Sequence, residues 1–112
     1  RRLSDAGATV LLVPAAFTVP TGKAHWHTLL RARAIESACF VLAPAQVGSH
    51  EDGRETYGHS LVIDPWGEVL LDMGDKAGLG FVDIDLTCIE QVRARVPVLA
   101  HRRALPERVV VS

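Results

Sequence analysis

Several kinds of residue that would indicate a special environment are scarce in this sequence. Aromatic residues make up only 5% of its 112 positions. The two cysteines, Cys39 and Cys88, lack the spacing of a disulfide framework, which favours reduced thiols and a cytoplasmic location over a secreted scaffold. The longest apolar run, residues 10–17, is far too short to cross a bilayer, and no signal-peptide pattern opens the chain.

Charge of one sign is also missing. Twelve basic and thirteen acidic residues give a formal net charge of −1, and the basic residues are scattered among the acidic ones. A nucleic-acid-binding surface needs a basic patch or stripe, which this pattern does not supply. We therefore expect neither nucleic acid nor membrane among the partners.

The sequence itself is typical of a folded α/β domain. Hydrophobic residues make up 48% and charged residues 22%, and 112 residues suffice for one compact domain. Residues 1–6 have the pattern of the last turns of a helix, with Gly7 at its end, and no methionine precedes them. We therefore expect the sequence to be a fragment of a longer protein.

Apolar periodicity and turn residues predict the order of the elements. We expect strands at 9–13, 40–43, 60–63, 68–71 and 80–85, helices at 21–38 and 85–96, and a polar loop at 48–58. The first two strands are continuous apolar runs, typical of strands buried on both faces. Thr21 is the expected N-cap of the long helix, whose apolar stripe comprises Trp26, Leu29, Leu30, Ala34 and Ser37. This order predicts a layered α/β sandwich.

Five histidines raise the question of a metal site. His25 and His27 are two residues apart on a predicted helix and therefore point to different faces, whereas zinc-binding helices use a spacing of four. His50 and His59 lie in or beside the polar loop. We predict solvated or hydrogen-bonded histidines and no metal or other cofactor.

A cysteine nucleophile is the other chemistry to weigh. Cys39 opens a buried strand, where a thiol behaves as a small hydrophobic group, and Cys88 lies on a short helix. Neither pattern indicates an activated thiolate, so we predict no catalytic residue within the chain.

Six motifs in register resemble the nitrilase superfamily of carbon–nitrogen hydrolases, and more narrowly the amidase branch that includes deaminated glutathione amidase and omega-amidase. They are Val13-Pro14-Ala15-Ala16-Phe17-Thr18, Thr21-Gly22-Lys23-Ala24-His25-Trp26, Leu30-Arg31-Ala32-Arg33-Ala34-Ile35-Glu36, Ala43-Pro44-Ala45-Gln46, Gly53-Arg54 with Tyr57-Gly58-His59-Ser60, and Asp64-Pro65-Trp66-Gly67-Glu68-Val69. The resemblance implies an α/β fold, here the C-terminal half of an α-β-β-α sandwich, with residues 1–112 as a partial domain and residues 104–112 as a tail.

The same resemblance implies a Glu, Lys and Cys triad that forms a thioester with a small carboxylate-bearing amide. None of the three triad residues maps onto this chain. Ala16, Phe17 and Thr18 match the segment that borders the substrate, and we expect them to be substrate-binding. Two positions depart from the pattern: His27 stands where relatives often have glutamate, and Ala104-Leu105 replaces a proline near the C-terminus.

The sequence leaves three functions open: part of an amidase, a catalytically silent nitrilase-like binding or interaction protein, and a self-sufficient small α/β domain. For the first, we expect a homodimer or higher homo-oligomer with the helix at 24–38 in the interface. The face used would involve Arg31, Ala34 or Ile35.

Overall fold

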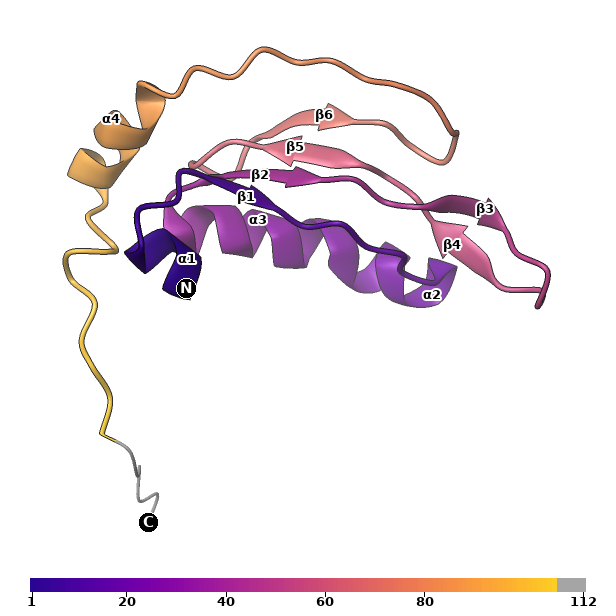
Figure 1. Cartoon of the computed structure of the whole chain (residues 1–112), viewed down its shortest axis with the longest axis horizontal. Coiled ribbons are helices and arrows are strands. Elements are labelled where there is room, and N and C mark those ends of the chain that lie inside the picture. Colours follow the sequence, from indigo (N-terminus) through magenta and orange to yellow (C-terminus); the bar gives the residue numbers. More distant parts are fainter. Residues whose placement is uncertain (107–112) are drawn as a thin grey trace.

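The chain forms a four-stranded sheet and a separate two-stranded ribbon, with one long helix beneath the sheet (Figure 1). The computed structural model describes residues 1–106. The sheet has the order β1 (Val10–Leu12), β2 (Phe40–Ala43), β5 (Leu61–Ile63), β6 (Val69–Asp72). β1 is parallel to β2, and the other neighbours are antiparallel. The ribbon pairs β3 (Val47–Ser49) with β4 (Glu55–Tyr57). The expected α/β fold class is confirmed.

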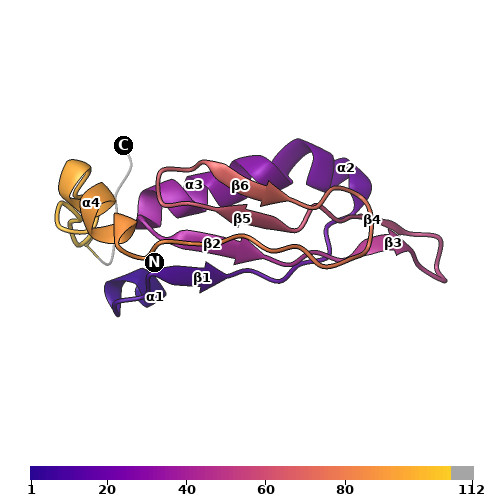
Figure 2. The ribbon, with the colours of Figure 1, turned by 90° about the horizontal axis from the view of Figure 1, so that it is seen from above.

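Four helices and one π-helical turn accompany the sheet in the described residues. They are α1 (Arg2–Asp5), α2 (Val19–Thr21), the π-helical turn η1 (Gly22–Trp26), α3 (His27–Ser37) and α4 (Cys88–Arg95). α3 runs along one face of the sheet, as the two perpendicular views show (Figures 1 and 2). No helix among residues 1–106 is long and apolar enough to span a bilayer.

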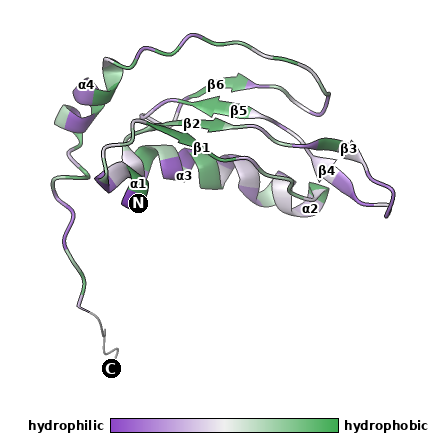
Figure 3. Cartoon of the chain, in the orientation of Figure 1, coloured by the Kyte–Doolittle hydropathy of each residue, from purple (hydrophilic) through white to green (hydrophobic). Residues whose placement is uncertain are grey.

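The core lies between α3 and the sheet. Its buried members are Leu11, Trp26, Leu30, Ala34, Cys39, Val41, Ala43, Leu61 and Ile63. The four strands are predominantly hydrophobic, whereas α3 carries a mixed pattern, as expected of a helix with one face turned to a core (Figure 3). Burial of this apolar surface is the main favourable contribution to folding.

The long helix differs from its predicted form in two respects. Thr18, rather than Thr21, is the N-cap residue: its backbone is extended, and Pro20 lies in the first turn of α2. Leu29 is 53% exposed and does not belong to the buried stripe, because it lies about 100° around the helix from Leu30, at the flank of the face that meets the sheet. The other expected stripe residues are buried.

β1 is not buried on both faces. Leu11 faces α3, but Leu12 is 70% exposed on the opposite face. Residues 73–87 return across that side of the sheet (Figures 1 and 2), yet Leu79 and Phe81 point away and remain almost fully exposed. For β1 the prediction of burial on both faces was wrong, because an apolar run shows that a strand suits two covering layers and not that both are present. For β2 the prediction is confirmed, since Phe40 and Val41, which point to opposite faces, are both buried.

Two further expectations need correction. Residues 80–85 form no strand, although their residues alternate, because no neighbouring strand supplies hydrogen bonds. The segment at 48–58, expected to be a polar loop, instead contains most of the β3–β4 ribbon. Its many turn-forming residues gave no indication of strands.

The strands predicted at 60–63 and 68–71 are confirmed, and they pair as a hairpin. β5 and β6 flank a turn in which the Gly67 N–H donates to the Asp64 carbonyl over 2.9 Å. α4 begins at Cys88, and Asp85 accepts hydrogen bonds from the backbone N–H and the hydroxyl of Thr87. Of the expected tail, residues 104–106 are exposed, and the remainder lies outside the described residues.

Candidate functional site

A small surface hollow lies where the segments after β1 and β2 meet the ribbon. Its volume is about 130 Å³, and its lining comprises Ala16, Thr18, Gln46, His50, Arg54 and Thr56. Two of the three residues expected to border a substrate, Ala16 and Thr18, therefore lie at one site.

Backbone pairing fixes the walls of this hollow. The Ala15 N–H donates to the Pro44 carbonyl, and the Gln46 N–H donates to the Ala15 carbonyl. An isolated antiparallel bridge joins Thr18 to Thr56 on β4. Pairing of this kind holds three segments, distant in sequence, at fixed separations.

Phe17 lies on the other side of the same segment. Its ring packs against Trp26 with 5.0 Å between centroids, and it contacts the core cluster. Its carbonyl accepts the Tyr57 N–H over 2.8 Å. Phe17 thus supports the wall from behind while its neighbours, Ala16 and Thr18, line the hollow.

The polar groups of the hollow come mainly from the ribbon. Arg54 is largely exposed, and its Nε–H donates to Asp52 over 2.6 Å. The His50 ring nitrogen Nε2 lies 3.1 Å from the Thr56 hydroxyl. The sequence did not identify Gln46, His50, Arg54 and Thr56 as a group. The pattern that could have indicated the ribbon is the alternation Glu55-Thr56-Tyr57 after a turn at Gly53.

Neither cysteine contributes to this hollow. Cys39 is fully buried, and its thiol donates to the Ala8 carbonyl over 3.2 Å. Burial, reinforced by the charges of Asp64 and Asp85, raises the pKa of the Cys88 thiol above its ordinary value. The Arg93 guanidinium lies 3.5 Å from Cys39 Sγ, but the thiol is inaccessible, and the charged neighbours of Cys88 are acidic, so neither thiol has the accessible, electropositive setting of a nucleophile.

A second cluster joins three side chains that the sequence keeps apart. The Asp72 carboxylate bridges two imidazoles: Oδ2 lies 2.7 Å from His27 Nε2, and Oδ1 lies 2.9 Å from His59 Nδ1. Burial pushes the pKa of Asp72 upward, but hydrogen bonds from His27, the Gly74 N–H and His59 outweigh it and leave the pKa below its ordinary value. His25 lies on the exposed surface outside this cluster.

Comparison with known proteins identifies what the chain is similar to. The family model described as Carbon-nitrogen hydrolase matches residues 1–94. The deaminated glutathione amidase of Synechocystis sp. (strain PCC 6803 / GT-S) is 55% identical over 102 residues, which cover 91% of this chain and 38% of the relative. The human deaminated glutathione amidase is 50% identical over 101 residues, covering 90% and 31%.

Solved structures of the same superfamily also match this chain. The Caenorhabditis elegans NitFhit protein matches with a TM-score of 0.85 and 49% identity over 89% of this chain and 24% of that one. Saccharomyces cerevisiae Nit3, a member of branch 10 of the nitrilase superfamily, matches with a TM-score of 0.82 and 32% identity over 90% and 37%. The chain spans roughly a third of the length of the curated relatives named above.

Proposed function

Because this chain belongs to the carbon–nitrogen hydrolase family, we propose that it is part of an amidase that cleaves the C–N bond of a small amide bearing a carboxylate. The relatives named deaminated glutathione amidase support amide hydrolysis as the reaction class. The observation that carries the substrate class is Arg54 at the hollow formed with Ala16 and Thr18.

A guanidinium is well suited to that role. Its planar array of N–H donors matches the two oxygens of a carboxylate, and charge-assisted bonds of this kind are stronger than neutral ones. Arg54 is held by a single exposed pair with Asp52, so a substrate carboxylate can compete for its remaining N–H groups.

The chemistry would come from a Glu, Lys and Cys triad outside this chain, as the family resemblance implies. The glutamate takes the proton of the cysteine thiol, and the thiolate attacks the amide carbon. The C–N bond then breaks, and the nitrogen leaves as ammonia with the proton held by the glutamate. Water then attacks the thioester, giving the free acid and restoring the thiol. Within this scheme residues 1–112 are a partial domain that supplies pocket wall, with Ala16 and Thr18 beside the substrate and Phe17 packed behind them.

Substitution of Arg54 tests the proposal in the full gene product that contains this chain. With Arg54→Gln, kcat/KM for a monoamide of a short dicarboxylic acid should fall by roughly 10–100-fold, the usual worth of a hydrogen bond to a charged group. Hydrolysis of a neutral amide of equal length should be unchanged. Arg2→Gln, which removes an exposed arginine remote from the hollow, is the matched control.

Two results would contradict the proposal. Equal losses on the charged and neutral amides would remove Arg54 as the carboxylate anchor. Absence of ammonia release from every amide by the unsubstituted gene product would favour the silent binding protein instead.

We also propose that the outer face of α3 forms a homodimer contact. Ile35 is half exposed there and lies against the turn at Gly67, and Trp66 is exposed on the same turn with the Arg95 guanidinium 4.5 Å from its ring centroid. Exposed aliphatic and aromatic side chains with arginine at the edge are typical of interfaces. Ala34 cannot belong to this face, because it is fully buried against the sheet.

A cytoplasmic location completes the proposal. Cys39 and Cys88 are both free thiols in the structure, and the first is fully buried. Unpaired thiols of this kind are compatible with a reducing compartment.

A further inference from the structure

The cluster of His27, His59 and Asp72 brings three metal-ligating side chains to one point. One ligand atom from each, an imidazole nitrogen or a carboxylate oxygen, lies within 4.8 Å of the others. The residues come from three places: the first turn of α3, the connection before β5, and the end of β6. The tertiary fold therefore brings these residues together, since they are not close in sequence.

Hydrogen bonds with the surrounding residues hold the His59 backbone and the Asp72 carboxylate in place. The Trp26 indole N–H donates to the His59 carbonyl over 2.8 Å, and the His59 N–H donates to the Gly74 carbonyl over 2.8 Å. The Gly74 N–H in turn donates to Asp72 Oδ1 over 2.9 Å. A hydrogen bond to a ligating carboxylate, as here from Gly74 to Asp72, is a regular feature of metal sites.

His59 also has an unusual backbone. Its φ is +57°, in the left-handed region that few residues other than glycine adopt. Such a conformation costs free energy and persists where the surrounding structure enforces it, often at functional positions. Stacking of the Tyr57 ring on the imidazole, 4.1 Å between centroids, fixes the plane of the ring as well.

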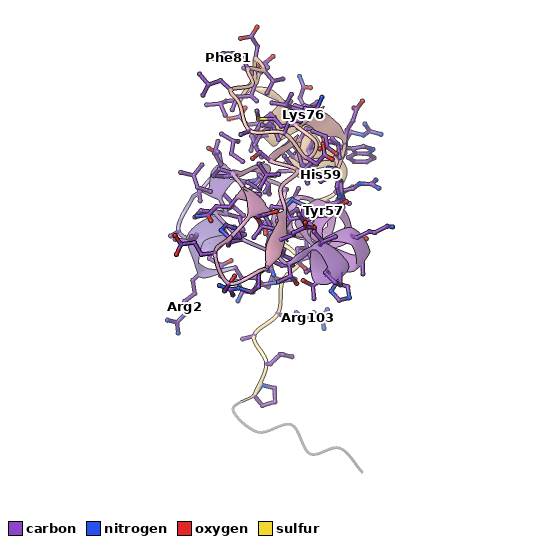
Figure 4. The ribbon with its side chains drawn as sticks, turned by 90° about the vertical axis from the view of Figure 1, so that its right-hand side faces the viewer. Arg2, Tyr57, His59, Lys76, Phe81 and Arg103 are labelled. Carbon is purple, nitrogen blue, oxygen red and sulfur yellow. The ribbon has the colours of Figure 1, made fainter. Side chains whose placement is uncertain are left out.

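The cluster is accessible from solvent. The side chains of His27, His59 and Asp72 are 33%, 24% and 34% exposed. A surface hollow of about 380 Å³ lined by Tyr57 and His59 reaches it, and Figure 4 shows these two residues adjacent on one side of the molecule. An ion can therefore enter, and solvent can complete its coordination.

We propose that His27 Nε2, His59 Nδ1 and a carboxylate oxygen of Asp72 bind one divalent transition-metal ion of the zinc class, with water in the remaining position. Two imidazoles and one carboxylate suit Zn²⁺ or Co²⁺ better than Mg²⁺ or Ca²⁺, which prefer oxygen ligands alone. The site is independent of the proposed amide hydrolysis. It would fasten the start of α3 to the end of β6.

Coordination requires a limited adjustment of the ligand atoms. Bonds of about 2.0–2.1 Å in a tetrahedral arrangement separate neighbouring ligand atoms by about 3.3 Å. Asp72 Oδ2 lies 2.7 Å from His27 Nε2, Asp72 Oδ1 lies 2.9 Å from His59 Nδ1, and one ligand atom from each residue lies within 4.8 Å of the others. Binding through a single carboxylate oxygen therefore requires rotation of the Asp72 side chain and changes of up to about 1.5 Å in the separations of ligand atoms. Among residues 1–106, no lysine or arginine forms an ion pair with Asp72 that an ion would have to displace.

Calorimetric titration of the metal-free full gene product with Zn²⁺ tests this proposal, with Co²⁺ absorption as a report on the ligand field. We expect the unsubstituted protein to bind one more equivalent than His27→Gln or Asp72→Asn, or to bind it at least about 100-fold more tightly, since loss of a mere outer partner costs 10–100-fold. His25→Gln, two residues from His27 but outside the cluster, should bind like the unsubstituted protein. Saturation should raise the melting temperature by on the order of 5 °C.

A second measurement needs no substitution and therefore does not depend on a variant folding. Imidazole ¹⁵N resonances followed during Zn²⁺ titration should shift strongly for His27 and His59 and little for His25 and His50. Identical stoichiometry and affinity in all four proteins, or shifts spread evenly over these histidines, would overturn the proposal and leave a carboxylate hydrogen-bonded to two imidazoles.

Discussion

Gly22 lies directly against the ring of Tyr57. A methyl group built on the Gly22 backbone would stand 2.5 Å from Tyr57 Cγ, which is closer than real side chains approach. Gly22 has right-handed helical dihedral angles, so its lack of a side chain serves this approach and not a special conformation. The contact sets the position of Tyr57 between η1 and the ribbon.

Gly22→Ala should therefore destabilise the protein although alanine is the better helix former. Overpacking costs about 1–3 kcal/mol, and the gain in helix propensity returns about 1 kcal/mol. We expect a net loss on the order of 1 kcal/mol in chemical denaturation of the full gene product. Gly78→Ala, where a methyl group meets nothing within 4 Å, is the control, and equal stability of both variants would contradict the close approach.

Ile63→Ala should remove a central part of the core. Ile63 is fully buried in the cluster between α3 and the sheet, so truncation should cost about 2–5 kcal/mol and Ile63→Val about 0.5–1.5 kcal/mol. Leu79→Ala, at a residue 89% exposed, should change stability by less than about 0.5 kcal/mol. An unfolding titration in which Ile63→Ala and Leu79→Ala coincide would contradict this assignment of the core.

Alkylation kinetics should show the raised pKa of Cys88. Burial and the charges of Asp64 and Asp85 disfavour the thiolate, so Cys88 should react more slowly at neutral pH than an unperturbed thiol. Asp64→Asn should lower the pKa and speed the reaction with iodoacetamide, measured by peptide mass spectrometry. Asp52→Asn is the control for removal of an exposed carboxylate, and no difference between the two variants would exclude the charge effect.

The 112-residue chain expressed alone should release no ammonia from dicarboxylic monoamides, because no residue in it has the setting of a nucleophile. Cys39→Ala should leave this result unchanged, since the Cys39 thiol is buried against the Ala8 carbonyl. Ammonia release that disappears in the Cys39→Ala variant would show that the thiol is catalytic after all.

Ile35→Glu should weaken self-association of the full gene product. Ile35 is 46% exposed on the outer face of α3, where a charge costs little in the monomer but must be desolvated in an interface. Sedimentation should show a shift toward monomer, whereas Leu79→Glu should leave the oligomer intact. Ala34→Glu would be a poor test, since a charge at that buried position would disrupt the core itself.

The sequence predicted those elements whose signals are local. The turn Asp64-Pro65-Trp66-Gly67 and the buried run Phe40–Ala43 appear in the structure where their chemistry placed them. Signals that depend on a partner failed: residues 80–85 alternate correctly but have no neighbouring strand, and Leu12 lacks the layer that its apolar run suits.

The residues of the two candidate sites were likewise predictable only where the signal was local. Ala16 and Thr18 could be placed at a hollow by resemblance, but Arg54 joins them only through pairing of the ribbon. The spacing argument against a metal site compares His25 with His27, which are two residues apart. The structure instead joins His27 to Asp72, which is 45 residues away and which no spacing rule could have identified.

Position 67 shows how the fold restricts the changes open to the chain. Gly67 has φ +90°, and a methyl group there would lie 2.6 Å from Cδ1 of Ile35. A residue larger than glycine at 67 would adopt a strained backbone and would also clash with Ile35. A smaller side chain at 35 would relieve the clash but not the strain. The residue allowed at 67 in the turn therefore depends on the residue at 35 in the helix, although the two positions are 32 apart along the chain. If the outer face of α3 is an interface, variation of Ile35 is limited from both sides, by the turn within one subunit and by the second subunit.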